Sequence, residues 1–344
     1  MTVNPAADGR QPPTLADLAR EAGTSASTAS RALSARGYVS AAARGRVLEA
    51  ADRLGYVPNA SARTLKQRTS RVVGVVVSDL GNPFYARLAH GIEQTLREAD
   101  YQMVVLGDNS ESAEEVAGAR TFIAMRAPGV ILTPVAGQAA AILAAQGIAV
   151  VEVDRQVADV ECDAVVIDNE GGAEAATAHL LGLGHRRIAL LVADTTLTTD
   201  VGRMTGYRRA HRAAKVTVDD RLIVRIRFDD AEAEQRIDAL LANEAPTAIF
   251  AANNLLAEQA WRVLRRRRLR LPKQVSLVGF DDVPWMEMVE PGITAVAQPT
   301  VELGRCAARL LLRRLEDPGC PSTVERLDPT LVIRRSTAPP AETP

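Results

Sequence analysis

One short segment near the N-terminus carries side chains that could read a base pair. Helical spacing in residues 25–33 turns Ala29, Ala32 and Leu33 inward and leaves a polar stripe that includes Arg31 on the outside. An outward arginine can make two parallel hydrogen bonds to guanine in the major groove of DNA. The candidate DNA contacts of this region are Thr14, Ser25, Ala26, Ser27, Thr28, Ser30 and Arg31.

The elements that must position this stripe are two short helices joined by a turn. Thr14 and Asp17 have the spacing of a capping box, in which each side chain bonds the other residue's free backbone N–H. Apolar residues then recur at i, i+3, i+4 and i+7 over residues 15–22, Gly23 supplies a turn, and Ser25 can cap the second helix. We therefore predict a helix-turn-helix. The alternative for this segment alone is a solvated helical hairpin.

A third helical pattern begins after Ser40 and ends at the sequence GYVP (55–58), because proline disfavours helix in the residue before it. The segment that follows, NASARTL (59–65), is too short and polar to be a stable helix alone, so it needs a partner to fold. Residues 1–70 hold ten basic and five acidic side chains, a net charge of +5, whereas the whole chain sums to −1. A basic head on an acidic body fits phosphate binding at one end.

The rest of the chain alternates short β-branched runs with longer helical patterns, which is typical of parallel sheets built from β-α-β units. The first set of runs is 72–77, 103–107, 130–133 and 148–154, and a second set begins at Asp168 with runs at 187–192, 222–226, 248–252 and 275–280. The predicted fold class is therefore α/β: a small all-α head followed by two doubly wound lobes. Strand ends that face each other across such lobes form a crevice for ligands.

Polar and aromatic residues gather at these expected strand ends. Flat rings can stack on the C–H face of a sugar, while Asp, Arg, Asn and Gln exchange several hydrogen bonds with its hydroxyls. Each residue also has a structural alternative: the aspartates could cap helices or pair with arginine, Asn82 could only turn the chain, and Trp285 could be a core or dimer anchor. The candidate effector contacts are Asn82, Phe84, Tyr85, Asp154, Arg155, Arg203, Phe228, Asn253, Asp281, Trp285 and Gln298, with Arg203 expected to open a helix.

The motifs TLADLAREAG, STASRAL and GYVPNASARTLKQR, with the strand-end residues of the body, resemble the LacI/GalR family of bacterial transcription regulators over about residues 14–336. The resemblance implies a homodimer on pseudo-palindromic operator DNA and an effector in the cleft, with a ribose-like set of contacts. It also implies a hinge at residues 59–67 that becomes helical on the operator, with Leu65 wedged into the minor groove. The hinge contacts it implies are Asn59, Ala62, Arg63, Leu65 and Lys66.

Several residues depart from the pattern that the family usually shows. Asn254 and Pro128 each stand where the family usually has Asp, and Ser34 stands where Asn commonly ends the second helix. The first departure bears on the charge balance of the effector site. Ala26 and Ser27, at the positions that most often choose operator bases, are both short, so discrimination would depend on Arg31, on water and on DNA shape.

Length and composition place the chain among ordinary globular proteins. At 344 residues with 47% hydrophobic and 24% charged residues, two or three domains are expected. Three cysteines without metal-like spacing indicate reduced thiols, and the N-terminus has no signal-peptide pattern, so we expect a cytoplasmic protein without a membrane segment. The expected divisions are a disordered 1–13, a head 14–58, a hinge 59–70, a body 71–336 (lobe one about 71–167 and 294–322, lobe two about 168–293 and 323–336) and a disordered tail 337–344.

Two other functions compete with DNA regulation as explanations of this sequence. An enzyme is disfavoured because the chain has no Walker loop, G-x-S-x-G or H-E-x-x-H motif, and its four histidines form no ligand-like pair, so no catalytic residue, metal or cofactor is expected. A sugar-transport receptor would fit the body alone. It would need an export signal and would have no use for a DNA-binding head.

Overall fold

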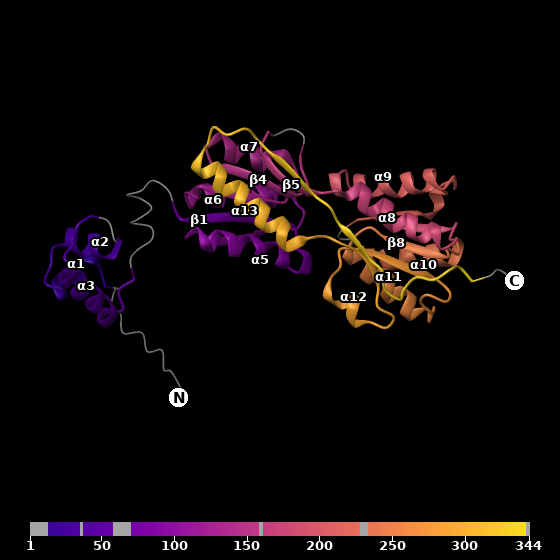
Figure 1. Ribbon diagram of the computed structural model, residues 1–344, viewed down its shortest axis with the longest axis horizontal. Coiled ribbons are helices and arrows are strands. Elements are labelled where there is room, and N and C mark those ends of the chain that lie inside the picture. The colour runs from indigo at the N-terminus through magenta and orange to yellow at the C-terminus, as the bar shows by residue number, and fades with distance from the viewer. Residues whose placement is uncertain (1–12, 35–36, 58–69, 158–160, 228–232, 342–344) are drawn as a thin grey trace, which may run out of the picture. The chain divides into compact units, whose positions relative to one another are not determined.

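The computed structural model describes residues 13–34, 37–57, 70–157, 161–227 and 233–341. The chain divides into two compact units between Ser70 and Arg71 (Figure 1), which is where the sequence predicted the body to begin. None of the described helices is long and apolar enough to cross a membrane.

The first unit is a small three-helix domain formed by α1 (Leu15–Glu21), α2 (Ala26–Ser34) and α3 (Ala41–Leu54). The predicted capping box is present: the Thr14 amide donates to the Asp17 carboxylate at 3.0 Å, and the Asp17 amide donates to the Thr14 hydroxyl. The Ser25 hydroxyl accepts from the Thr28 amide at 3.1 Å at the start of α2. Leu18, Ala29, Val47 and Ala50 are fully buried and hold the three helices together.

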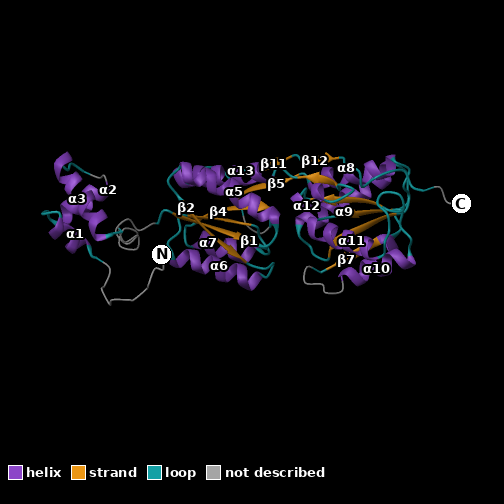
Figure 2. Ribbon diagram, turned by 90° about the horizontal axis from the view of Figure 1, so that it is seen from below, coloured by secondary structure: helices purple, strands orange, loops and turns teal. Residues whose placement is uncertain are grey.

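Lobe one of the second unit is a parallel sheet in the order β11-β5-β4-β3-β1-β2. Helices α5 and α13 cover one face of this sheet and α6 and α7 cover the other (Figure 2). Its strands are β1 (Val72–Val77), β2 (Gln102–Gly107), β3 (Gly129–Leu132), β4 (Ala149–Asp154), β5 (Asp163–Ile167) and β11 (Val324–Leu327), and its helices are α5 (Pro83–Glu98), α6 (Ser112–Ala124), α7 (Gly137–Ala145) and α13 (Thr300–Glu316).

Lobe two repeats the architecture with a sheet in the order β12-β10-β9-β8-β6-β7, in which only β12 runs antiparallel to its neighbour. Helices α8 and α9 pack together, and so do α10 and α11. The strands are β6 (Ile188–Ala193), β7 (Ile223–Ile226), β8 (Ala248–Ala251), β9 (Ser276–Phe280), β10 (Thr294–Ala297) and β12 (Thr330–Val332), and the helices are α8 (Asn169–Gly182), α9 (Thr198–Ala213), α10 (Ala233–Asn243), α11 (Asn254–Arg266) and α12 (Pro284–Met288), with a 3-10 turn at Asp220–Leu222.

The chain passes between the lobes three times, and two of these crossings differ from the sequence expectation. Strand β10 belongs to the lobe-two sheet and β11 to the lobe-one sheet, so residues 294–297 and 324–327 lie in the opposite lobes from those predicted. The late strands are short, and β11 alternates exposed and half-buried residues at a sheet edge. Such a segment carries little hydrophobic signal, and its lobe is decided by pairing with β5 rather than by local sequence.

The prediction of a disordered tail is wrong for residues 337–341. The Thr337 hydroxyl lies 2.9 Å from His179 Nε2, and the Ala338 carbonyl accepts from His185 Nε2 at 2.9 Å. Ser336, just before them, is fully buried. The Pro-rich composition indicated disorder, but tertiary packing on lobe two fixes the backbone. Residues 342–344 and 1–12 lie outside the described residues.

Helix α5 packs closely on α13, and three candidate effector contacts lie at the start of α5. A substitution that disturbs this packing tests how much it stabilises the body. A Cβ on Gly91 would meet the Val301 carbonyl oxygen at 2.1 Å, so a backbone shift is unavoidable. We expect Gly91→Ala to lower the free energy of unfolding by about 1–3 kcal/mol. Gly182→Ala is the matched control, because nothing lies within 4 Å of its Cβ. It should be neutral or stabilising by up to about 1 kcal/mol. Urea unfolding followed by circular dichroism measures both, and equal midpoints would contradict the close-packing argument.

Candidate functional site

Polar side chains from the strand ends of both lobes converge on a cavity of about 50 Å³. Nine of the eleven predicted effector contacts line this cavity. Phe228 lies outside the described residues, and Trp285 does not line it. The Trp285 ring packs 5.9 Å from the Trp261 ring beside the lobe-two core, which agrees with the structural alternative for that residue. The full lining is Asn82, Phe84, Tyr85, Asp154, Arg155, Leu197, Thr199, Asp200, Arg203, Asn253, Asn254, Leu255, Asp281 and Gln298.

Arg155 is the centre of the lobe-one half of the cleft. Its Nη2 donates to the Ser78 hydroxyl at 2.6 Å and to the Tyr85 hydroxyl at 2.8 Å, and its Nε lies 3.6 Å from the Asp154 carboxylate. Arg155 Nη1 is buried and has no hydrogen-bond partner among the described residues. Burial raises the pKa of Asp154 above its usual value, although Arg155 and Arg203 oppose that rise. This half of the site thus holds a donor with unused capacity.

Arg203 is the centre of the lobe-two half. Its Nε donates to Asn169 Oδ1 at 2.9 Å and its Nη1 to the Ala252 carbonyl at 2.7 Å, while its guanidinium lies 3.8 Å from the centroid of the Phe280 ring. Its Nη2 is 3.9 Å from Asp281. Arg203 lies in the second turn of α9, which begins at Thr198, so the prediction that it opens the helix is wrong. The planar guanidinium is held between an amide, a carbonyl and a ring, which fixes its orientation.

Gln298 and Asp281 form the next layer of this half. Gln298 Nε2 donates to Asp281 Oδ1 at 2.5 Å, and the backbone N–H of Asn254 donates to Asp281 Oδ2 at 3.3 Å. Gln298 Oε1 is buried without a hydrogen-bond partner among the described residues. An acceptor in lobe two therefore complements the unused arginine donor in lobe one.

The two aspartates at the strand ends share an uncommon backbone conformation. Asp154 is the last residue of β4 and has φ +71°, and Asp281 directly follows β9 with φ +67°. Non-glycine residues rarely adopt this left-handed region, although Asp and Asn tolerate it better than most. Strained backbone of this kind gathers at binding and catalytic sites. The equivalent positions in the two lobes thus present carboxylates in the same way.

Two asparagines join the lobes across the cleft. Asn254 Nδ2 donates to Asn82 Oδ1 at 2.9 Å, and Asn82 Nδ2 lies 3.4 Å from Asn254 Oδ1. Asn82 also caps α5 by accepting from the Phe84 amide at 3.0 Å, and Asn253 caps α11 by accepting from the Leu256 amide at 2.8 Å. The alternative considered for Asn82 was a chain-turning role only. The structure shows that it caps α5 and also lines the cleft.

Five residues of the lining are absent from the predicted effector contacts. Asn254 was noted only as a departure from the family pattern, and Asp200 is the most informative of the other four. Its carboxylate accepts from the Thr195 hydroxyl at 2.5 Å, and burial raises its pKa above the usual value. Asp200 lies three residues before Arg203 on α9, so the two share one face of that helix. An earlier predicted start for α9 would have revealed this pair. The others missed are Leu197, Thr199 and Leu255.

The predicted DNA-reading stripe lies on the solvent side of α2. Ala26, Ser27 and Arg31 are exposed, Ser30 is half-buried, and Arg31 Nε donates to the Ser27 carbonyl at 3.2 Å. The hinge contacts predicted at Asn59, Ala62, Arg63, Leu65 and Lys66 lie outside the described residues. Across the described ranges, no group of three or more His, Cys, Asp or Glu residues is arranged to hold a metal ion.

Comparisons with known proteins agree with this division into head and body. Residues 14–59 match the family model for bacterial regulatory proteins of the lacI family, and residues 177–337 match that for a periplasmic binding protein-like domain. The transcriptional regulator DegA of Bacillus subtilis is 32% identical over 331 residues, covering 95% of this chain and 98% of that relative. The chain belongs to the LacI family of bacterial regulatory proteins.

Other relatives of this LacI-family regulator extend the comparison. The ribose operon repressor of Haemophilus influenzae is 28% identical over 94% of this chain and 98% of its own length. The structure of the CelR–cellobiose complex is 32% identical with a TM-score of 0.71, covering 94% of this chain and 99% of that one. The lac repressor dimer bound to operator and an anti-inducer is 26% identical with a TM-score of 0.82, covering 95% and 100%.

Lobe one of this LacI-family regulator also buries three carboxyl groups near Arg155. Glu115 accepts from the Val135 and Ala136 amides at 3.1 and 3.2 Å, and Glu152 accepts from the Val157 amide at 3.0 Å. Burial raises the pKa of Glu115 and of Glu152 to about 7, and that of Asp108 to about 6. All three side chains are fully buried. The folded state therefore holds protons that the unfolded chain releases at lower pH.

This proton uptake predicts a pH dependence of stability. Glu152 stays protonated to about pH 7 in the folded chain, against a usual value of 4.5, so the free energy of unfolding should fall as pH rises through that interval. Glu152→Gln, which cannot ionise, should remove part of this decline, on the order of 1 kcal/mol. Glu98→Gln, at an exposed position, controls for the loss of a carboxylate. Urea titrations between pH 4.5 and 7.5 measure the slopes, and an unchanged slope in Glu152→Gln would reject the protonated state.

Proposed function

We propose that this protein is a cytoplasmic repressor that binds operator DNA as a homodimer and whose DNA affinity is set by a sugar, a pentose such as ribose, in the cleft. The observation that carries the proposal is the pair of unused polar atoms, Arg155 Nη1 and Gln298 Oε1, buried in opposite halves of the cavity. Unpaired buried polar groups are unfavourable unless a ligand satisfies them. One unused donor and one unused acceptor on residues that line the same cavity match a hydroxyl compound.

The remaining lining supports a sugar over other small molecules. Phe84 and Tyr85 pack edge to face with centroids 5.1 Å apart and supply apolar surface to the cleft lining. Aspartate, arginine and amide groups supply the directional bonds that orient hydroxyls. Two relatives support the same class, since one is named a ribose operon repressor and the CelR structure holds cellobiose. The small cavity leaves room for no more than one sugar unit in the cleft itself.

On the DNA side, the exposed stripe of α2 enters the major groove and the hinge binds in the minor groove. Arg31 reads a base edge, Arg63 and Lys66 hold phosphates, and Leu65 wedges into the central base step. Two-fold symmetry of the dimer then requires a pseudo-palindromic operator. A transport receptor with no DNA function is the alternative, and the exposed arginine stripe on a basic head disfavours it.

Control by effector follows from closure of the lobes. A sugar that bonds both halves of the cleft stabilises one lobe arrangement over others, and the hinges transmit that difference to the heads. Reversal of a 99:1 population requires the effector to favour one state by about 5.5 kcal/mol, or about ten thousandfold in affinity. Several charge-assisted hydrogen bonds of about 1.5–3 kcal/mol each supply that range.

The DNA part of the proposal is tested at Arg31. Arg31→Ala should weaken operator binding by about 1–3 kcal/mol and relax the preference at one base pair, because a bidentate base contact is lost. Arg20→Ala is the control, since Arg20 is exposed on α1 and paired with Asp17 at 3.1 Å. Fluorescence anisotropy on operator and random duplexes at matched salt measures both. Equal losses on the two duplexes would show that Arg31 holds phosphate only.

The effector part is tested at Asp281. Asp281→Asn should weaken sugar binding by about 1–3 kcal/mol, because a carboxylate that orients Gln298 and accepts a hydroxyl is replaced by a weaker partner. Asp220→Asn, exposed on the far side of lobe two from the cleft lining, is the control. Calorimetry with pentoses, hexoses, polyols and purines on the full chain gives the affinities. Binding of purines alone, or of no sugar, would make the sugar assignment wrong.

A further inference from the structure

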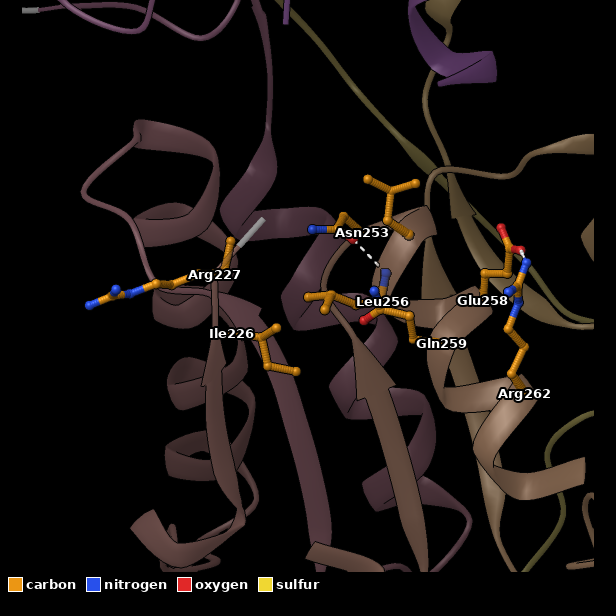
Figure 3. A pocket seen from close by; sticks show the side chains of 9 residues that line it. Ile226, Arg227, Asn253, Leu256, Glu258, Gln259 and Arg262 are labelled. Carbon is orange, nitrogen blue, oxygen red and sulfur yellow. Dashed lines mark hydrogen bonds and ion pairs between the residues drawn. The ribbon is translucent and has the colours of Figure 1, made fainter. Parts of the chain in front are cut away.

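A second and larger cavity adjoins the cleft on lobe two. Its volume is about 210 Å³, against about 50 Å³ for the cleft cavity. Asn253 and Leu255 line both, so the two spaces share a wall. Figure 3 shows the side chains that surround it, with Ile226 and Arg227 on one side and the α11 residues on the other. This space, called the side cavity below, is lined by Ala193, Ile226, Arg227, Asn253, Leu255, Leu256, Glu258, Gln259 and Arg262.

The cavity lies at the edge of the sheet where ligands of doubly wound folds bind. Ala193 is the last residue of β6, Ile226 is the last residue of β7, and Asn253 follows β8 and caps α11. Carboxyl ends of parallel strands form the ligand-binding edge of such sheets. The side cavity therefore continues the proposed effector site along the same edge of the lobe-two sheet.

The floor of the side cavity is aliphatic, and one polar atom in its wall is unused. Ala193, Ile226 and Leu256 are nearly fully buried and present only methyl and methylene groups. Gln259 Oε1 is buried without a hydrogen-bond partner among the described residues. An apolar surface with a few fixed polar groups is the usual composition of a small-molecule pocket.

The charged residues at this cavity do not favour an anionic ligand. Glu258 and Arg262 form an ion pair one helical turn apart on α11, so their charges offset each other (Figure 3). The Arg227 side chain extends away from the α11 residues in the same view. A neutral group with hydroxyls and C–H faces suits this lining better than a phosphate, which requires concentrated positive charge.

We infer that the pentose in the cleft is one unit of a two-unit glycoside, whose second sugar unit lies in the side cavity, where Gln259 Oε1 accepts a hydroxyl hydrogen. This inference rests on the proposed sugar effector of the cleft. The cleft cavity holds the directional contacts and the side cavity holds most of the space, so the second unit adds buried surface and one hydrogen bond. The side cavity in lobe two then determines whether the protein binds two-unit sugars more tightly than monosaccharides.

Calorimetry on the full chain tests the inference with ribose, arabinose and xylose against two-unit probes such as arabinobiose and xylobiose. A two-unit probe should bind about tenfold or more tightly than its own monosaccharide, because the second unit buries further surface in a preformed pocket. Ala193→Leu, which fills the floor of the side cavity and does not line the cleft, should abolish this advantage and leave the monosaccharide affinity unchanged.

A second variant tests the inference independently, in case Ala193→Leu does not fold. Gln259→Met keeps the volume of the side chain and removes the acceptor, so it should weaken two-unit binding several-fold without affecting the monosaccharide. Gln146→Met, at an exposed site in lobe one, is the matched control and should change neither affinity.

The outcomes separate this inference from the proposed function. Equal affinities for one-unit and two-unit sugars, or variants that weaken both equally, would overturn the inference while a sugar effector stands. Failure of every sugar to bind would overturn both the sugar effector and its extension. A two-unit preference that Ala193→Leu and Gln259→Met each remove would support the side cavity as the second subsite.

Discussion

Charge buried in the cleft is the constraint on which the body of this protein depends. Arg155 and Arg203 are each about 95% buried, and an unpaired guanidinium at such depth would be strongly destabilising. Asp154 and Asp281 offset these charges, and each aspartate lies at the end of a strand in the same lobe as its arginine. Both pairs line the same cavity, so the two sheets end at one shared site. The three chain crossings between the lobes connect the two sheets beside this cavity.

The distribution of strong and weak bonds then permits movement between the lobes. Both ion pairs of the cleft lie within a lobe, whereas the amides of Asn82 and Asn254 join the lobes through neutral hydrogen bonds. A neutral hydrogen bond contributes about 0.5–1.5 kcal/mol, less than a charge-assisted one. Opening the cleft thus breaks exchangeable bonds and leaves each charge compensated. An aspartate in the position of Asn254, as the family usually has, would add charge across the cleft, so the departure keeps that contact neutral.

Much of the fold and most of the cleft follow from local sequence signals. The capping box at Thr14 and the runs of buried strand residues depend on neighbours in the chain, and polar residues just after such runs must lie at the ligand edge of a parallel sheet. Other features depend on distant partners. The strand β11 is defined by pairing with β5, the place of Trp285 by its contact with Trp261, and the order of residues 337–341 by packing on two histidines. None of these contacts leaves a periodic pattern that a single sequence displays.

The aspartates at the strand ends show how one residue type can serve both backbone and ligand. A turn with φ near +70° after a buried strand favours glycine, but glycine would leave Arg155 or Arg203 without its carboxylate. Glutamate would keep the charge, yet its longer side chain lacks the local bonding that lets Asp and Asn tolerate this conformation. Aspartate alone meets both demands. Backbone geometry and electrostatics together therefore require aspartate at Asp154 and at Asp281. Ligand contacts alone would not explain why the residue is aspartate at both positions.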